Sequence, residues 1–265
     1  MSDAVNARLA TRSLSVGYGS EPVVEGLDLT IPEGQFTALL GPNGSGKSTV
    51  LKSLARLLLP AAGEVLLDGA NLRAKGAKAV ARDVGLLAQG AVAPEGLRVI
   101  ELVRQGRYPH RGLFDNWRAE DEEAVAEALR LTETAHLAER GIETLSGGQR
   151  QRVWTAMVLA QTAPILLLDE PTTYLDLAHQ LDLLSLMRRL VDTRGLTVVA
   201  VLHDLNQAAR FCDDLVFLKS GRLVEKGPVP DVFRADLIEA VFGVSVSILS
   251  DPESGRPMCV PRMTR

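Results

Sequence analysis

The chain has 265 residues, of which 46% are hydrophobic and 23% are charged. These proportions are typical of a globular protein with a packed core, and they exclude extensive disorder. The formal net charge of −4 argues against a general affinity for nucleic acid, although it leaves room for a local basic groove.

The chain carries no sequence feature of a secreted or membrane-spanning protein. Cys212 and Cys259 are far apart and have no metal-ligand spacing, which predicts free thiols in a reducing compartment. Residues 1–15 contain no apolar segment of the kind found in signal peptides. The longest uncharged run, residues 153–168, is shorter than the ~20 residues that a bilayer span needs. We therefore expect a cytosolic protein that reaches a membrane only through a partner.

The first third of the chain alternates strand and turn signals. Residues 13–40 end in a short apolar strand, residues 36–40, that leads directly into a glycine-rich loop. Residues 47–60 have apolar residues at helical spacing and end at a proline. Two more strands are predicted over residues 63–69 and 83–89.

The middle of the chain is predicted to be helical. Residues 99–107, 119–140 and 147–161 have helical patterns, and no strand signal occurs between residues 90 and 160. The acidic run at residues 119–127 is interpreted as a solvated helix face and not as a metal site, with its acids favouring the helix start.

The last hundred residues return to strands. Two unalternating apolar runs, residues 165–170 and 196–204, indicate strands of a parallel sheet buried on both faces, and a helix is predicted between them. Hairpins are predicted over residues 214–227 and 245–262. The expected fold class is therefore α/β, with a nucleotide-binding core and a helical insertion.

The glycine-rich loop matches the pattern G-x-x-x-x-G-K-[ST] between a strand and a helix, the context that this phosphate-binding motif requires. Its glycines let the backbone surround phosphate oxygens, Lys47 can reach the β- and γ-phosphates, and Ser48 can ligate Mg²⁺. The predicted nucleotide-contacting residues are Gly41, Pro42, Asn43, Gly44, Ser45, Gly46, Lys47, Ser48 and Thr49.

Two acids end the strand at residues 165–170. Asp169 can hold the magnesium ion, directly or through water, and Glu170 can orient and deprotonate the attacking water. A second anion-binding arrangement, "LSGGQ" at residues 145–149, precedes a helix about a hundred residues after the first one. From the residues alone its ligand stays open.

Together these motifs resemble the ATP-binding cassette family, over residues 18–203 and in family order. "LSGGQ" is similar to the signature sequence of that family. Tyr18 resembles its adenine-stacking aromatic, Gln89 its glutamine loop and His203 its switch histidine. Without the resemblance, Tyr18, Gln89 and His203 are each also compatible with a purely structural role.

The resemblance implies a P-loop ATPase core with an antiparallel β subdomain and an inserted α-helical subdomain. The whole chain would be one cassette, with the core and β subdomain at about 1–89 and 161–265 and the helical part at about 90–160. Catalytic roles are implied for Glu170, His203 and Gln89. Mg²⁺ ligands are implied at Ser48, Gln89 and Asp169, and further nucleotide contacts at Ser146, Gly147, Gly148, Gln149 and Asp176.

In this family cassettes pair head to tail, so that the P-loop of one copy faces the signature loop of the other across ATP. The resemblance thus implies a homodimer of ATPase subunits that works with permease subunits on the cytoplasmic face of the membrane. The expected permease contact is a groove near Gln89 and residues 90–115. A substrate-binding protein would take part indirectly, and no nucleic acid is expected.

Several stretches are similar to importers of ferric siderophores, haem and cobalamin, among them "GRYPHRG" at residues 106–112 and Tyr174 beside Asp176. The ferric-siderophore branch is favoured, with haem and cobalamin as alternatives. A cassette ATPase acting on nucleic acid or ribosomes is the alternative from another class, disfavoured by the short insertion and the two cysteines. A nucleotide sensor without hydrolysis is disfavoured because Glu170 and His203 are both present.

Overall fold

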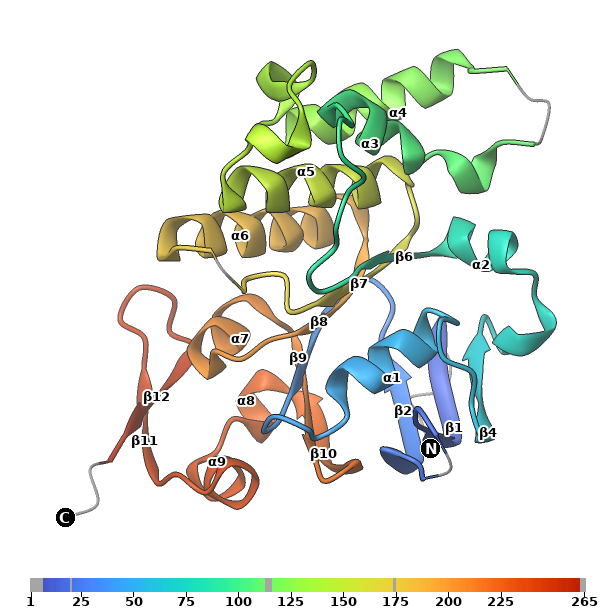
Figure 1. Ribbon diagram of the computed structural model, residues 1–265. Coiled ribbons are helices and arrows are strands. Elements are labelled where there is room, and N and C mark those ends of the chain that lie inside the picture. The colour runs from blue at the N-terminus through green and yellow to red at the C-terminus, as the bar shows by residue number, and fades with distance from the viewer. Residues whose placement is uncertain (1–6, 20, 113–115, 174, 263–265) are drawn as a thin grey trace.

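The computed structural model describes residues 7–19, 21–112, 116–173 and 175–262. Tyr174, part of the subfamily resemblance, lies outside these ranges. At the centre is a six-stranded sheet of order β10-β9-β3-β8-β7-β6 (Figure 1). Its parallel strands are β3 (Phe36–Leu40), β6 (Val84–Leu87), β7 (Ile165–Asp169), β8 (Thr197–Val201) and β9 (Asp214–Lys219). The antiparallel strand β10 (Arg222–Pro228) forms one edge of the sheet.

The central strands are buried on both faces, which explains their unalternating apolar sequences. In β8, Val198 and Ala200 face one hydrophobic cluster, whereas Val199 and Val201 face another. Every residue of β3, β7 and β8 is buried. The expected strands at residues 36–40 and 165–170 and within 196–204 are therefore confirmed.

One cluster joins the central sheet to a second, antiparallel sheet of order β2-β1-β4-β5. Its strands are β1 (Leu9–Val16), β2 (Val24–Ile31), β4 (Ala62–Leu67) and β5 (Ala70–Asn71). The helix α1 (Lys47–Leu54) contributes Val50, Leu51 and Leu54 to the same cluster. This is the expected antiparallel β subdomain.

The other face of the central sheet is covered by helices and a hairpin. The helices are α6 (Leu177–Arg194), α7 (Leu205–Phe211), α8 (Val229–Val232) and α9 (Ala235–Phe242). The hairpin of β11 (Val246–Ser250) and β12 (Pro257–Pro261) packs against α7 and buries Cys259 there. Both predicted C-terminal hairpins are thus present.

Three helices form a separate layer above the sheet (Figure 1): α3 (Val99–Gln105), α4 (Ala119–Leu131) and α5 (Gly147–Ala160). They enclose their own hydrophobic cluster, which includes Val103, Val125 and Val153. A buried ion pair crosses this layer, with Arg107 Nε 2.9 Å from Asp121 Oδ1. The acidic run is therefore not wholly solvated, because Asp121 points inward whereas Glu120, Glu122 and Glu123 are exposed.

Element ends differ from expectation where the backbone turns. The helix expected over residues 47–60 ends at Leu54, because Arg56 adopts a positive φ of 61°. The helix expected over 119–140 ends at Leu131, two residues before Glu133 at φ 56°. The sequence analysis did not identify α2 (Ala77–Asp83), α7, α8 or α9, each of eight residues or fewer. Short 3-10 helices lie at Leu72–Ala74, Tyr108–His110, Ala135–Leu137 and Ile142–Thr144.

None of the helices built from the described residues is both long and apolar enough to cross a membrane.

Candidate nucleotide site

The glycine-rich loop and the three predicted catalytic residues follow the carboxyl ends of four neighbouring strands. The glycine-rich loop follows β3, His203 follows β8, Glu170 follows β7 and Gln89 follows β6. In an open parallel sheet this edge is where ligands bind. The topology therefore brings together residues that lie far apart in the chain.

The glycine-rich loop is built to approach phosphate closely. Gly46 has φ 97° immediately before α1, and a Cβ there would lie 2.6 Å from Val24 Cγ2. The hydroxyl of Ser45 is buried and has no hydrogen-bond partner among the described residues. The loop thus combines a constrained backbone, a helix N-terminus and a free hydroxyl, and these fit a phosphate group.

Lys47 lies along this loop. Its Nζ donates hydrogen bonds to the carbonyls of Gly41 (2.8 Å) and Pro42 (3.0 Å). Burial lowers the pKa of Lys47, and the nearby charges of Glu170 and Asp169 oppose that shift. An ammonium partly removed from water attracts phosphate more strongly than an exposed one.

Ser48 and Asp169 form the candidate metal pair. The Ser48 hydroxyl donates to Asp169 Oδ1 at 2.6 Å. Burial raises the pKa of Asp169, and the Ser48 hydrogen bond opposes the rise. Within the described ranges no group of three or more His, Cys, Asp or Glu side chains could hold a metal. The chemistry fits Mg²⁺ that takes one or two protein oxygens and completes its shell with phosphates and water.

Glu170 is the centre of a polar cluster. Gln89 Nε2 donates to its Oε2 at 2.7 Å, Thr173 Oγ1 donates to the same oxygen at 3.1 Å, and His203 Nε2 lies 2.9 Å from Oε1. Glu170 itself has φ 52°, an uncommon backbone conformation for a residue with a side chain. Such outliers concentrate at functional sites, where surrounding contacts hold them in place. We call Glu170, Gln89, Thr173 and His203 the glutamate cluster.

Tyr18 lies at the edge of the site and is 64% exposed. Lys52 Nζ donates to its hydroxyl at 3.3 Å and lies 5.6 Å from the ring centroid. A flat, exposed ring beside the phosphate loop is suited to stacking on a base.

The signature residues lie elsewhere, at the start of α5. Ser146 Oγ accepts from the backbone N–H of Gln149 at 3.2 Å, and Gln149 Oε1 accepts from the N–H of Ser146 at 3.1 Å. This reciprocal capping box satisfies the helix start locally. No hydrogen bond among the described residues joins Ser146, Gly147, Gly148 or Gln149 to the glutamate cluster.

Asp176 caps the neighbouring helix α6. Its Oδ1 accepts from the backbone N–H of His179 at 3.0 Å and lies 2.7 Å from His179 Nδ1. These two bonds hold the pKa of Asp176 below its usual value.

Two residues of the site escaped the sequence analysis. Thr173 lies three positions after Glu170, and Lys52 lies one helical turn after Ser48. Thr173 could have been found from its place in "EPTT" directly after the two acids. Nothing in the sequence signals the contact between Lys52 and Tyr18.

The family model described as ABC transporter matches residues 24–173, the range that holds the phosphate loop, the signature and both acids. The chain belongs to the ABC transporter family. Similar curated proteins cover nearly all of this cassette. The ferric enterobactin transport ATP-binding protein of Escherichia coli K12 is 52% identical over 96% of this chain and 94% of its own length. The iron(3+)-hydroxamate import ATP-binding protein of Bacillus subtilis is 47% identical over 95% of this chain and 94% of its own length.

A solved structure is similar over the whole cassette. It is described as a metal-chelate type ABC transporter in an inward-facing conformation and is 28% identical, with a TM-score of 0.84 and coverage of 98% of both chains. The ABC ATPase fold expected from the sequence is thereby confirmed.

Proposed function

We propose that this cassette hydrolyses ATP to power an importer of ferric siderophores. The observation that carries the ATPase part is the glutamate cluster, in which three side chains from separate segments hold Glu170 beside the phosphate loop. The substrate class rests on relatives whose names concern ferric enterobactin and iron(3+)-hydroxamate.

In this proposal the phosphate loop binds the β- and γ-phosphates through its backbone N–H groups and through Lys47. Tyr18 stacks on the adenine, with Lys52 holding its hydroxyl. Ser48 and Asp169, 2.6 Å apart, would hold Mg²⁺, with Gln89 as a further ligand. When bound, the ion neutralises charge that develops on the phosphate oxygens.

Glu170 accepts a proton from the water that attacks the γ-phosphorus. Its two carboxylate oxygens already accept bonds from Gln89 and Thr173 on one side and contact His203 on the other. This arrangement fixes the carboxylate plane before the substrate binds. In the proposal His203 contacts the γ-phosphate, and Gln89 links the site to the helical layer that follows it in the chain.

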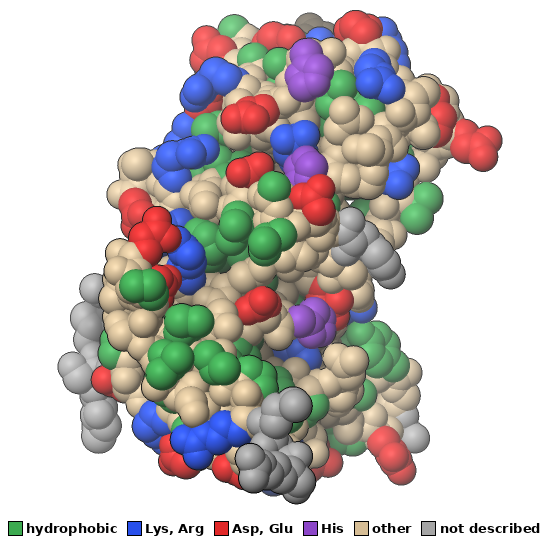
Figure 2. Space-filling model, turned by 90° about the vertical axis from the view of Figure 1, so that its left-hand side faces the viewer, with side chains coloured by type: hydrophobic (Ala, Val, Ile, Leu, Met, Phe, Trp, Pro, Cys, Tyr) green, Lys and Arg blue, Asp and Glu red, His purple; other side chains and the backbone are tan. Residues whose placement is uncertain are grey.

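The signature loop completes the site of a second copy. Its polar side chains, Ser146 and Gln149, bond within the capping box, and Gly147 and Gly148 have no side chains that could block an approaching phosphate. Exposed apolar side chains gather on the face that holds the α6 start and the β11–β12 hairpin (Figure 2). They include Leu177, Leu249 and Val260. A head-to-tail homodimer would cover part of this face.

The permease partner would dock in the helical layer. A hollow there is lined by Glu101, Arg104, Tyr108, Trp117 and Met157, and Tyr108 is 72% exposed. The hollow overlaps residues 90–115 of the expected permease contact but does not include Gln89, which was expected to lie near it. Docking there would place the cassette on the cytoplasmic face of the membrane. Crosslinking from a cysteine at position 108 should capture a permease, whereas one at the opposite edge, Lys226→Cys, should not.

The function is tested by uptake of labelled ferric siderophore, haem and cobalamin in cells that lack this protein. The cells are complemented with wild type or with Glu170→Gln. Uptake of a ferric siderophore restored only by wild type is the expected result. Restoration of haem or cobalamin uptake instead would change the substrate class. No response to any of the three would contradict the subfamily resemblance and indicate that the importer carries another solute, with the ATPase activity unaffected.

A further inference from the structure

The loop after Glu170, residues 171–173 and 175–176, accepts hydrogen bonds from glutamine side chains of two helices. Gln180 of α6 donates from Nε2 to the carbonyls of Leu175 (3.0 Å) and Thr172 (3.3 Å). Gln151 of α5 donates to the carbonyl of Pro171 at 2.9 Å. None of these glutamines belongs to the motifs that predicted the site.

Gln180 is itself oriented from α7. Gln207 Nε2 donates to Gln180 Oε1 at 2.7 Å, and the Gln207 side chain is buried. A glutamine amide has two N–H groups and one carbonyl oxygen, and those of Gln180 are all directed at this loop or at α7. The bond from Gln207 of α7 therefore fixes the orientation of the Gln180 amide. That amide in turn holds the carbonyl groups of the loop through its two hydrogen bonds.

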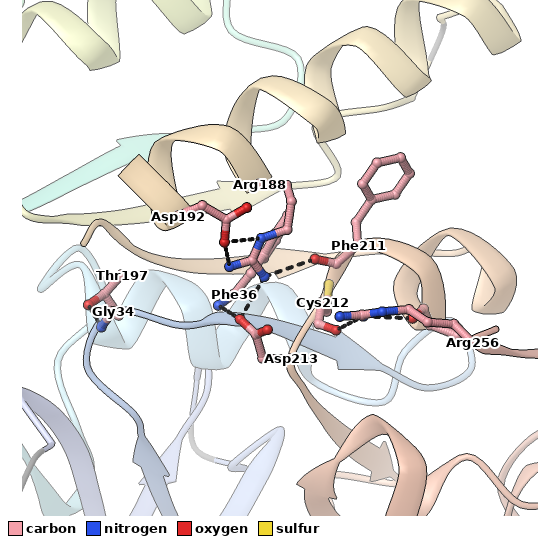
Figure 3. A network of polar contacts seen from close by, with 10 residues as sticks. Gly34, Phe36, Arg188, Asp192, Thr197, Phe211, Cys212, Asp213 and Arg256 are labelled. Carbon is pink, nitrogen blue, oxygen red and sulfur yellow. Dashed lines mark hydrogen bonds and ion pairs between the residues drawn. The ribbon is translucent and has the colours of Figure 1, made fainter. Parts of the chain in front are cut away.

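The helix α7 is a fixed support for this contact. Figure 3 shows Arg188 of α6 and Arg256 of the β11–β12 turn reaching the carbonyls at the end of α7. Arg188 Nη1 donates to Phe211 O at 3.3 Å and to Asp213 Oδ2 at 2.7 Å, while Arg256 Nη1 donates to Ala209 O at 3.0 Å. At the other end, Asn206 pairs with both backbone groups of Cys259.

The start of α7 follows His203 directly, since Asp204 is its cap residue. The loop held by Gln180 joins Glu170 to Asp176. The Gln180–Gln207 pair thus connects two segments that carry proposed site residues. One segment follows the proposed catalytic residue His203, and the other runs from the proposed catalytic residue Glu170 to the proposed nucleotide contact Asp176.

We infer that Gln180 is a positioning residue for ATP hydrolysis, which transmits the placement of the His203 segment to the loop after Glu170 through its contact with Gln207. The inference rests on the proposed roles of Glu170 and His203. Gln180 touches neither substrate nor metal in this proposal. It acts through the backbone of the loop.

The decisive variant is Gln180→Glu, which keeps the length of the side chain and an acceptor for Gln207 but loses both donors to the loop carbonyls. We expect kcat to fall about tenfold, as loss of hydrogen bonds that order a site would give, with KM for ATP within about twofold and the variant fully folded at the assay temperature. Gln207→Leu should lower kcat about threefold. The double variant should be no slower than Gln180→Glu alone, because both act on one path.

The control is Ser185→Ala, an exposed position on the same helix. It should leave kcat, KM and Tm unchanged. Full activity in Gln180→Glu would overturn the inference, as would losses in the two single variants that multiply in the double variant. A fall in kcat that tracks a fall in folded fraction would also overturn it, since that indicates a merely structural role. Wild type and Glu170→Gln in the same assay report on the proposed function separately.

Discussion

The glutamate cluster and the signature loop are both predicted to meet ATP, yet they are built in opposite ways. The cluster draws four side chains from segments that follow β6, β7 and β8, and its bonds span up to 81 positions of sequence. In the signature loop, the side chains of Ser146 and Gln149 form a capping box within four residues. The glutamate cluster is assembled by the tertiary fold. The signature loop has its hydrogen bonds satisfied locally, and its residues Ser146 and Gly147 are exposed.

This difference shows how one chain can hold two predicted phosphate-binding elements that would contact different ATP molecules. A locally satisfied helix start needs no partner to fold, so it can be presented to a second molecule. The glutamate cluster forms only when the core is folded, so the geometry around the proposed general base Glu170 depends on the whole core. Five predictions test this contrast.

Lys47→Ala should have the largest effect. It removes the ammonium from the phosphate loop, and ATP binding and hydrolysis should both be lost, because the β- and γ-phosphates lose their main cation. Binding of a fluorescent ATP analogue measures this, with Lys226→Ala as the matched surface control. Unchanged affinity would exclude Lys47 from the site.

Glu170→Gln should lower turnover by roughly 10²–10⁴ while ATP binding is kept, the range expected when a general base is removed. The variant should accumulate as an ATP-stabilised dimer, measured by light scattering. Adding Ser146→Arg should prevent that dimer, since a long cation would occupy the outward-facing signature loop. A double variant that still dimerises with Mg-ATP would refute the head-to-tail arrangement.

Asp121→Asn tests how much the buried ion pair between Arg107 and Asp121 stabilises the layer of α3, α4 and α5, which carries the signature loop. It leaves the buried guanidinium of Arg107 without a counter-charge, so the free energy of unfolding should fall by about 3 kcal/mol. Urea unfolding measures the change, and Glu123→Gln on the exposed face of the same helix should change little. ATP affinity of the folded variant should be retained, because the phosphate loop lies outside this layer.

Ser146→Ala should cost about 1 kcal/mol, the usual value of a helix N-cap. The side chain loses its bond to the backbone N–H of Gln149, so the start of α5 frays. The same unfolding assay reports it, with Ser185→Ala as the control. A loss as large as that of Asp121→Asn would mean that the signature loop is not locally satisfied.

Glu127→Gln should have the smallest effect. Hydrogen bonds from Arg130 of α4 and Arg194 of α6 lower the pKa of Glu127 to about 2, and the Arg194 contact connects α4 to the end of α6. Because the folded pKa lies below the ordinary value, the contribution is present at neutral pH and is lost as the pH falls from 4.5 towards 2. Screening of these partly exposed charges limits it to about 0.5 kcal/mol at pH 7. The difference between variant and wild type should be smaller at pH 3 than at pH 7, and an equal difference at both would contradict the assignment.

The motifs, and most of the helices and strands that carry them, could be recognised from the sequence alone. The loop at residues 41–48 is contiguous, so its glycines, lysine and serine are legible without a fold. The apolar runs of β3, β7 and β8 are long enough to show burial on both faces. The short helices α2, α7, α8 and α9 were not predicted, whereas α1 and α3, which are similarly short, were expected within longer helical patterns.

Which residues of separate segments are in contact could be seen only in the tertiary structure. Gln89 and His203 reach Glu170 because β6, β7 and β8 are neighbours in the sheet, and the sequence does not reveal this strand order. Arg107 pairs with Asp121, and Gln207 with Gln180, because helices packed by their apolar faces bring polar residues of distant segments to one place. Local physics sets which residues can bind or react, whereas packing sets which of them share a site.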